Sequence, residues 1–155
     1  SVPTVCFPRW RYYFHWRLRF SAAKPSTFFI THANENKRVS DMGWELYPEG
    51  LYHLVKIVSK YQKPIYITES GLADAHDQYR TWYIRESIRQ IARAMREGAD
   101  VRGYFYWSLL DNFEWDKGFW PRFGLVEVDY KTLERKIRPS ASEYKKVIEA
   151  NAVEI

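Results

Sequence analysis

Two short apolar runs with one long helical pattern between them constrain the fold of this chain more than any other feature. In the first run, residues 65–68, every side chain is β-branched or aromatic, which favours a strand. A helical pattern covers residues 77–97 and ends at Gly98, and the second apolar run follows at residues 101–108. A strand, a helix and a strand at this spacing predict one right-handed βαβ unit with parallel strands.

Helical patterns also lie before and after this unit. Before it, apolar residues recur at the spacing of one helix face, with Pro48 in the first turn: Leu51, Leu54, Val55 and Val58. The helix at 77–97 is expected to bury Ile84, Ile88, Ile91 and Met95. Its solvated face is expected to carry Arg85, Arg89, Arg93 and Arg96. Residues 123–130 alternate like a short edge strand. In a last helix, Ser140 and Glu143 match a capping box, Val147 and Ile148 are expected to face the core, and Asn151 to end the helix.

Polar residues that could carry chemistry follow each of the two apolar runs. Glu69 ends the first run, where parallel strands of barrel enzymes place reactive groups, although a solvated strand-end residue or a helix cap would look the same. Residues 107–116, after the second run, contain two tryptophans, three acids and an amide. Tryptophan stacks on the flat face of a sugar, and carboxylates and amides bind its hydroxyls. The pattern therefore indicates a carbohydrate site, and an aromatic corner of the core with its acids facing water is the alternative.

Composition restricts the class of protein. A length of 155 residues with 46% apolar and 28% charged residues is typical of one globular domain. The single cysteine, Cys6, excludes an internal disulfide, and we expect a cytoplasmic protein. No stretch is long and apolar enough to span a membrane, and no secretory leader is evident. The four histidines lack metal-ligand spacing and no phosphate-binding glycine loop occurs.

The net charge of +5 is concentrated in the first quarter of the chain. Residues 1–38 hold seven basic residues and one acidic residue, whereas the remainder is close to neutral. Within them, residues 9–20 interleave arginines with aromatic residues, as a module binding single-stranded nucleic acid would. The same residues alternate like a half-buried strand, which is the interpretation we favour.

Three motifs resemble the C-terminal part of family 1 glycoside hydrolases, particularly the archaeal-type β-glycosidases. Residues 67–71, Ile-Thr-Glu-Ser-Gly, resemble the family's nucleophile motif, with Ser70 in place of the usual Asn. Residues 107–115 are similar to its sugar-binding loop, and residues 43–51 to the start of the helix before the nucleophile strand. The resemblance covers residues 41–150; residues 1–38 show no such match, although Tyr12-Tyr13 is faintly similar to a tyrosine pair on the strand before the nucleophile strand.

The resemblance implies an α/β fold, the C-terminal portion of a (β/α)8 barrel, over residues 39–155. It also implies a retaining β-glycosidase acting on β-glucosides, β-galactosides or oligosaccharides. By position Glu69 would be the nucleophile, Trp107 would stack on the sugar, Glu114 would hold its outer hydroxyls and Trp115 would hydrogen-bond one of them. Phe123 would line the same pocket. The resemblance also implies that neither a metal nor an organic cofactor is required.

The chain departs from the family pattern in one decisive respect, because it contains no acid/base motif of the T-x-N-E-P type. Glu45 and Glu49 are the nearest candidates by type, but not by position. A (β/α)8 barrel also takes about 250 residues. We therefore expect the chain to be inactive alone and to need the missing N-terminal part of the barrel, or self-association. The alternatives are a non-catalytic carbohydrate-binding module and, less favoured, a nucleic-acid-binding module built on residues 1–38.

Overall fold

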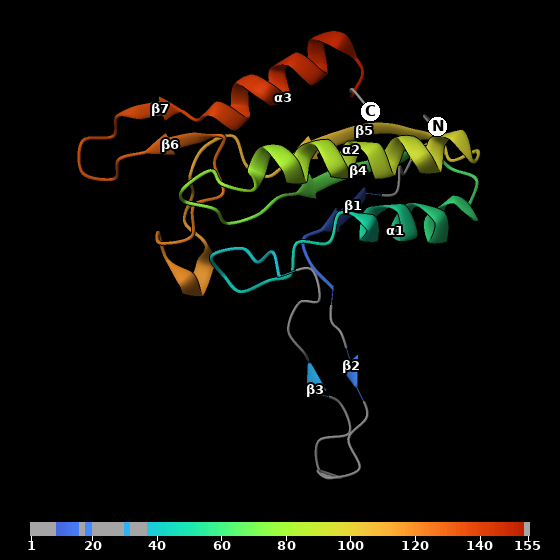
Figure 1. Ribbon diagram of the computed structural model, residues 1–155, viewed down its shortest axis with the longest axis horizontal. Helices are drawn as coiled ribbons and strands as arrows, with labels where there is room; N and C mark the ends of the chain where they lie inside the picture. Colours follow the sequence, from blue (N-terminus) through green and yellow to red (C-terminus); the bar gives the residue numbers. More distant parts are fainter. Residues whose placement is uncertain (1–8, 16–17, 20–29, 32–36, 154–155) are drawn as a thin grey trace, which may run out of the picture.

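The structure is a computed structural model that describes residues 9–15, 18–19, 30–31 and 37–153. Cys6 and most of the segment 20–36 lie outside these residues. The described elements, in chain order, are β1 (Arg9–Tyr12), β2 (Leu18–Arg19), β3 (Ile30–Thr31), α1 (Glu49–Ser59), β4 (Ile65–Ser70), α2 (Arg80–Arg96), β5 (Val101–Tyr106), the 3-10 turn η1 (Trp115–Lys117), β6 (Val126–Val128), β7 (Arg135–Ile137) and α3 (Pro139–Ala150) (Figure 1).

A three-stranded parallel sheet in the order β1-β4-β5 forms the centre of the molecule. The predicted βαβ unit is confirmed as β4-α2-β5, and α1 leads directly into β4. The structure adds β1 to this sheet, so the described residues 9–15 of the basic segment pack with the rest of the fold. Two small antiparallel pairs, β2-β3 and β6-β7, lie outside the sheet, and β7 had not been expected.

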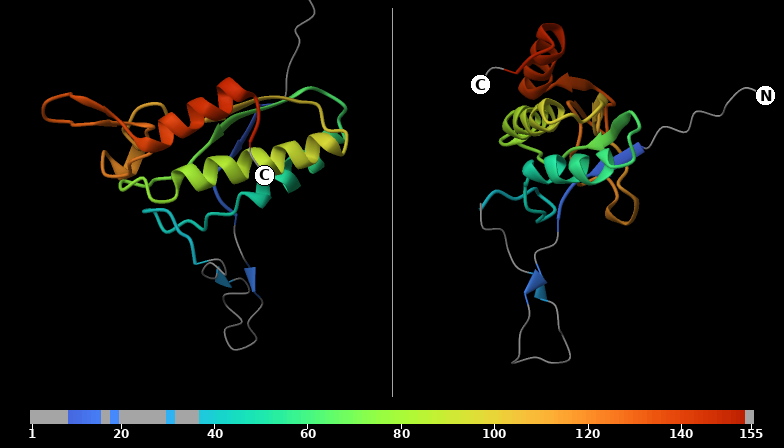
Figure 2. Two further views of the ribbon diagram at one scale, coloured as in Figure 1. Left: turned by 45° about the horizontal axis from the view of Figure 1, so that its top comes forward. Right: turned by 90° about the vertical axis from the view of Figure 1, so that its right-hand side faces the viewer.

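The helices cover one face of the sheet (Figures 1 and 2). Strand alternation directs Ile65 and Ile67 of β4 toward α1 and α2, where both side chains are fully buried. The expected apolar face of α1 lies against them: Leu51, Val55 and Val58 are buried, and Leu54 is partly buried. Apolar burial of this kind is the main stabilising term of such a layered α/β unit.

Three expectations about the helices are wrong. Met95 is 48% exposed and Ile148 is 60% exposed, because both side chains line the cavity between α2 and α3 and do not face the core. The capping box at Ser140 does not form. Instead the Asp77 carboxylate accepts hydrogen bonds from the backbone N–H of Ser140, at 2.9 Å, and from its hydroxyl, at 2.6 Å. A distant acid therefore caps α3, which local sequence could not indicate.

The sequence pattern also gave no sign that Arg80 would be fully buried. Its Nε donates to the Tyr106 hydroxyl at 2.9 Å, and its Nη2 donates to the carbonyls of Asp74 and Arg122 at 2.6 and 3.0 Å. Arg80 also forms an ion pair with Asp77. Arg80 thereby ties the start of α2 to β5 and to the loop that follows β5.

Candidate active site

The side chain of Glu69 lies at the C-terminal end of β4, and both of its carboxylate oxygens have a partner on β1 or just after it. The Tyr13 hydroxyl donates to Oε2 at 2.9 Å, and Arg11 Nε lies 3.0 Å from Oε1. Burial and the neighbouring Glu69 raise the pKa of the Tyr13 hydroxyl above its ordinary value. Tyr13 therefore remains a hydrogen-bond donor over the whole physiological range of pH.

An irregularity in the pairing of β1 and β4 brings these groups together. Trp10 is paired with Ile67, but the next residue, Arg11, is paired with Glu69, so Thr68 is an extra residue on β4. Such a bulge redirects the side chains beside it. It places Arg11 next to Glu69, whereas Trp10 packs against the core on the helix side.

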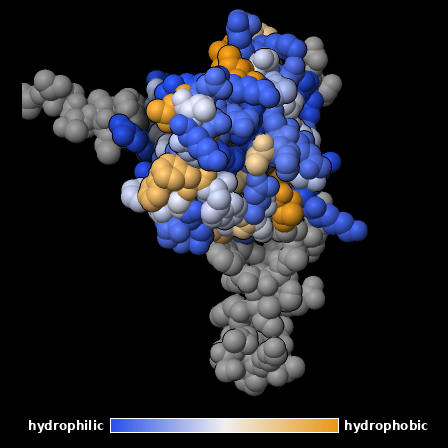
Figure 3. Space-filling model, turned by 90° about the vertical axis from the view of Figure 1, so that its left-hand side faces the viewer, coloured by the Kyte–Doolittle hydropathy of each residue, from blue (hydrophilic) through white to orange (hydrophobic). Residues whose placement is uncertain are grey.

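Glu69 lines a cavity of about 530 Å³ at the C-terminal ends of the strands. The residues that line it come from β1 and the residue after it, the loop before α1, β4, and the loop after β5: Arg11, Tyr13, Trp44, Glu69, Trp107, Asn112, Phe113, Glu114 and Trp115. The lining therefore combines indole faces with two carboxylates, an amide and a guanidinium. Figure 3 views the molecule from the end that carries η1 and the β6–β7 hairpin, and shows apolar patches separated by hydrophilic surface.

Four of the five residues singled out from the sequence lie in this cavity. Glu69, Trp107, Glu114 and Trp115 all line it. Glu114 is half-buried and its Oε2 accepts a hydrogen bond from Asn112 Nδ2 at 2.9 Å. The side chain of Trp115 is 80% exposed, so most of its ring faces solvent at the rim.

Phe123 occupies a different place from the one expected. It is 1% exposed and does not line the cavity. Its ring packs edge-on against Tyr13, with centroids 6.2 Å apart, and lies 6.4 Å from the ring of Trp44. Phe123 thus supports two lining residues from behind.

Five lining residues were not singled out from the sequence: Arg11, Tyr13, Trp44, Asn112 and Phe113. Arg11 and Tyr13 belong to residues 1–38, which the sequence motifs did not assign to the family. The faint similarity of Tyr12-Tyr13 to a tyrosine pair of the family was the one indication in this segment. Trp44 belongs to the motif before α1, which indicated a helix start and not a binding residue. Arg11, Tyr13 and Trp44 reach the cavity through tertiary contacts, whereas Asn112 and Phe113 belong to the loop after β5 that also carries Glu114.

The loop after β5 is held in place by Asp111, a buried carboxylate. Its Oδ1 accepts hydrogen bonds from the backbone N–H of Gly124 at 2.9 Å and from Arg138 Nη1 at 3.0 Å, and Arg122 Nη1 lies 3.2 Å from Oδ2. Burial alone would raise the pKa of this carboxyl, but the hydrogen bonds from Arg138 and Gly124 outweigh it and lower the pKa. Asp111 therefore stays ionised and fixes the loop that carries Glu114.

A glycine allows the ends of β4 and β5 to approach closely. A Cβ atom added to Gly71 would lie 1.8 Å from the carbonyl oxygen of Trp107. The backbone N–H of Trp107 donates to the carbonyl of Ser70 at 3.0 Å, which continues the strand pairing to the edge of the cavity. Glycine at position 71 thus sets the distance between Glu69 and Trp107.

The two other glutamates considered as acid/base candidates do not line this cavity. Glu45 is 4% exposed, and its Oε2 lies 2.9 Å from His15 Nε2. Glu49 belongs to α1, where it accepts a hydrogen bond from the Tyr47 hydroxyl at 3.2 Å. Among the described residues, Glu69 and Glu114 are the only carboxylates that line the cavity.

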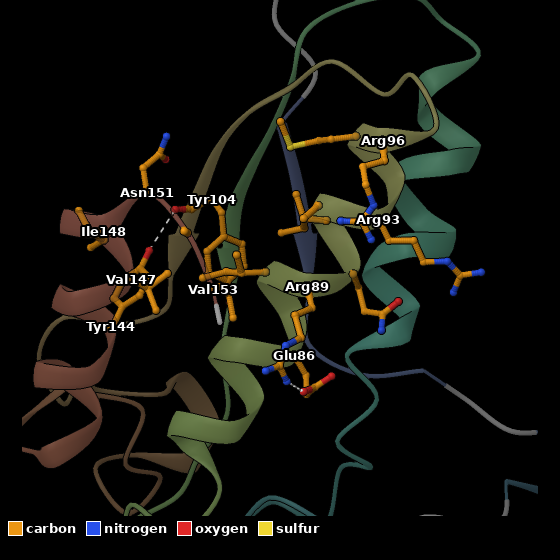
Figure 4. Close-up of a pocket in the computed structure, with 16 residues that line it drawn as sticks. Glu86, Arg89, Arg93, Arg96, Tyr104, Tyr144, Val147, Ile148, Asn151 and Val153 are labelled. Atoms are coloured by element: carbon orange, nitrogen blue, oxygen red, sulfur yellow. Dashed lines mark hydrogen bonds and ion pairs between the residues drawn. The ribbon is translucent and has the colours of Figure 1, made fainter. Parts of the chain in front are cut away.

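A second cavity, of about 620 Å³, lies between α2 and α3 on the helix side of β5 (Figure 4). Tyr104, Tyr144 and Val147 form part of its apolar wall, and arginines of α2 lie along its margin. The one carboxylate in its lining, Glu86, is paired with Arg89. The second cavity therefore lacks the pairing of carboxylates with tryptophans that marks the first.

The described part of the chain contains no cluster of three or more acidic, histidine or cysteine side chains suited to a metal ion. None of the helices within these ranges has the length and apolar character that a bilayer crossing requires.

Comparison with known proteins agrees with the architecture. Residues 13–153 match the model of glycosyl hydrolase family 1. The match therefore includes residues 13–38, which the sequence motifs did not assign to the family. The β-galactosidase of Sulfolobus acidocaldarius is 48% identical over 119 residues, which are 76% of this chain and 24% of that protein. The β-galactosidase of Pyrococcus woesei is 40% identical over 154 residues, which are 99% of this chain and 28% of that protein.

Solved structures give the same result. The β-glycosidase from Pyrococcus horikoshii superposes with a TM-score of 0.82 at 41% identity, covering 94% of this chain and 34% of that chain. The β-glucosidase from Thermotoga maritima in complex with castanospermine gives a TM-score of 0.87 at 37% identity. This superposition covers 96% of this chain and 36% of that chain. The chain thus spans 24–36% of the length of these relatives. The predicted α/β barrel portion is confirmed, and the chain belongs to glycosyl hydrolase family 1.

Proposed function

We propose that this chain carries the nucleophile and part of the sugar-binding site of a retaining β-glycosidase. The observation that carries the proposal is the placement of Glu69, whose carboxylate is held by Tyr13 and Arg11 at a cavity lined by tryptophans. The substrates would be β-glucosides, β-galactosides or related oligosaccharides, in keeping with the names of its relatives.

In the proposed reaction, a carboxylate oxygen of Glu69 attacks the anomeric carbon while the bond to the leaving group breaks. This gives a covalent glycosyl ester on Glu69, which water then hydrolyses with overall retention of configuration. Trp107 would stack on the sugar face, Glu114 would accept hydrogen bonds from its hydroxyls and the Trp115 indole would donate one. Phe123 would act indirectly, by fixing Tyr13 and Trp44.

The proposal requires a second carboxyl group about 5–5.5 Å from Glu69, to protonate the leaving group in the first step and to activate water in the second. No residue of the chain occupies the family's acid/base motif, and Glu114 is assigned to sugar binding. We therefore propose that the chain is inactive alone and that the rest of a barrel, or self-association, supplies the donor. No metal or organic cofactor takes part in the proposed chemistry, and we propose a cytoplasmic location.

A 2-deoxy-2-fluoro aryl β-glucoside with a good leaving group tests this proposal by intact-mass analysis. Such a reagent needs little acid assistance, so it examines the nucleophile separately from the proton donor. The chain would be incubated with the reagent alone, and again with the part of the Pyrococcus horikoshii enzyme that it does not cover. We expect one added glycosyl group on Glu69 in the second mixture, and none in Glu69→Gln.

The matched control is Glu114→Gln, which keeps the nucleophile and removes the other carboxylate of the cavity. Labelling that is slower in this variant but still at Glu69 would support the assigned roles. Labelling of the wild-type mixture at a residue other than Glu69, or none in an assembled mixture, would overturn the proposal.

A non-catalytic carbohydrate-binding module is the second candidate, because the cavity keeps Trp107, Glu114 and Trp115 without a recognised proton donor. Sugar affinity that is unchanged in Glu69→Ala, combined with no labelling, would favour it. A nucleic-acid module on residues 1–38 ranks last, since the described Arg11 is directed to Glu69.

A further inference from the structure

A pair of buried hydroxyl groups lies directly behind Glu69, on the helix side of the sheet. Ser70, the residue after Glu69, is fully buried, and its Oγ lies 3.2 Å from the hydroxyl of Tyr83. Tyr83 belongs to α2 and is also fully buried. This hydrogen bond therefore joins α2 to the C-terminal end of β4, one residue from the proposed nucleophile.

An irregularity in the pairing of β4 with β5 explains how Ser70 comes to face α2. Ile67 is paired with Tyr104 and Ser70 with Tyr106, so three steps along β4 correspond to two along β5. The extra residue returns Ser70 to the buried face that Ile67 occupies, while Glu69 lines the cavity on the other face.

Two further hydroxyls adjoin this pair. Ser87 follows Tyr83 by four residues, lies on the same face of α2 and is fully buried. Burial raises the pKa of Tyr83 above its ordinary value, and the nearby hydroxyls of Ser70 and Ser87 oppose the rise. Burial and Tyr83 raise the pKa of Tyr104, again opposed by Ser70. Four protonated hydroxyls thus meet between α2, β4 and β5.

Two of these four groups have no hydrogen-bond partner among the described residues, namely Ser87 Oγ and the Tyr104 hydroxyl, although both atoms are buried. A buried hydroxyl without a hydrogen bond is costly, and such groups are almost always satisfied by protein or by ordered water. Ile84 and Ile91, which flank Ser87 on the buried face of α2, are apolar and offer no partner.

Ser87 also differs from another serine within a helix of this chain. Ser59 of α1 donates its hydroxyl hydrogen to the carbonyl of Val55, one turn earlier, at 2.7 Å. This is a usual way for a helical serine to satisfy its hydroxyl. Ser87 Oγ makes no such bond with the helix and lies close to the Tyr83 hydroxyl instead.

We propose that Ser87 and Tyr104, together with the Ser70–Tyr83 pair, bind one ordered water molecule that links α2 to the end of β4. A buried water makes about three hydrogen bonds to polar groups that otherwise lack partners. The two unpartnered hydroxyls and the adjoining pair supply that number. If Glu69 acts as in the proposed function, on which this step rests, Ser87 is a positioning residue that acts on Glu69 through the water and Ser70.

Urea unfolding of Ser87→Ala, Tyr104→Phe and the double variant tests the water site. Each single variant removes one hydroxyl and should lower the folding equilibrium constant about 5- to 30-fold, because the water loses a partner. The double variant should lose at least about threefold less than the product of the two single losses, since either change releases the same water. Ser59→Ala is the matched control, and its loss should multiply with that of Tyr104→Phe.

A crystal structure of the chain should show one water within hydrogen-bond distance of Ser87 Oγ and the Tyr104 hydroxyl. Independent losses in the double variant, undiminished stability of Ser87→Ala, or a crystal structure in which these hydroxyls bond to protein groups with no water between them would each overturn the water site.

Labelling of Glu69 in the assembled mixture tests the positioning role. At saturating reagent, Ser87→Ala should label about tenfold more slowly, because small displacements of a reacting group are costly, and the half-saturating concentration should not change. Ser59→Ala should label as the wild type does. Equal maximal rates in the two variants would overturn the positioning role. Coupled losses of stability, combined with no labelling of the wild-type mixture, would overturn the proposed function and leave the water site standing.

Discussion

The hydroxyl of Tyr13 donates a hydrogen bond to the carboxylate of Glu69 across 2.9 Å, although 56 residues separate them in the chain. The contact exists because β1 pairs directly with β4 in parallel. Because burial and Glu69 raise the pKa of Tyr13, this bond persists at neutral and moderately alkaline pH.

Replacing Tyr13 with Phe should slow labelling of Glu69 in the assembled mixture about 10- to 100-fold. A hydrogen bond to a charged group contributes about 1.5–3 kcal/mol, and without it the carboxylate is less well oriented. Time-resolved intact-mass analysis measures the rate. Tyr61→Phe, at a position that is 59% exposed, is the control and should label normally. Equal rates for both variants would show that Tyr13 does not orient the nucleophile.

Replacing Arg11 with Met should leave the free energy of unfolding within about 1 kcal/mol of the wild type. The arginine side chain is 71% exposed, and exposed ion pairs contribute little to stability. Labelling of Glu69 in the assembled mixture should nevertheless change, because one carboxylate oxygen loses its partner. Urea unfolding and labelling rates together test this separation; a large loss of stability would contradict it.

Replacing Gly71 with Ala should destabilise the chain by about 1–3 kcal/mol, since the added Cβ would overlap a backbone oxygen that cannot rotate away. The strand ends must separate, which moves Trp107 from Glu69. Urea unfolding gives the free energy, and Trp107 fluorescence in a variant lacking the other tryptophans reports the displacement. Gly43→Ala is the comparison: nothing lies near its Cβ, and only its positive φ of 76° opposes alanine. A milder effect at position 71 than at 43 would contradict the close approach.

Replacing Asp111 with Asn should cost about 3–5 kcal/mol, because Arg138 would remain buried without its anionic partner. The pKa of Asp111 is lowered in the folded state, so its contribution is present above the unfolded pKa of about 3.9 and disappears as pH falls through the folded value. The variant should therefore lose less stability on acidification than the wild type. Urea unfolding between pH 3 and 7 measures both effects. Asp100→Asn, from an exposed pair with Arg102, is the control and should leave the free energy of unfolding close to that of the wild type.

Alkaline pH should destabilise the chain through its buried tyrosines. Burial raises the pKa of Tyr106 to about 12, against an ordinary value of 10.0. The unfolded chain then ionises first, so stability is intact below pH 10 and falls as pH rises toward 12, by at most about 1.4 kcal/mol per pH unit for this residue. Tyr106→Phe should flatten the decline in urea unfolding between pH 8 and 11. An equally steep decline in this variant would assign the effect to other groups.

Local sequence patterns were enough to predict the βαβ unit, and the motifs were enough to identify the family. Local patterns sufficed because the alternation of buried residues in β4, the apolar face of α1 and the glycine after α2 each express a preference of neighbouring residues. The motifs around Glu69 and Trp107 also identified four lining residues, because both stretches end parallel strands, whose C-terminal ends meet at one edge of a sheet.

The surroundings of Glu69 depend on contacts between segments that are distant in the sequence. Arg11 and Tyr13 reach it through strand pairing across more than fifty residues, and a bulge in that pairing selects which side chains face the carboxylate. The burial of Phe123, the capping of α3 by Asp77 and the exposure of Phe105 likewise depend on which surfaces meet. The physical reason is common to all of them: a local pattern fixes the face on which a side chain lies, and the packing of distant segments fixes what that face contacts.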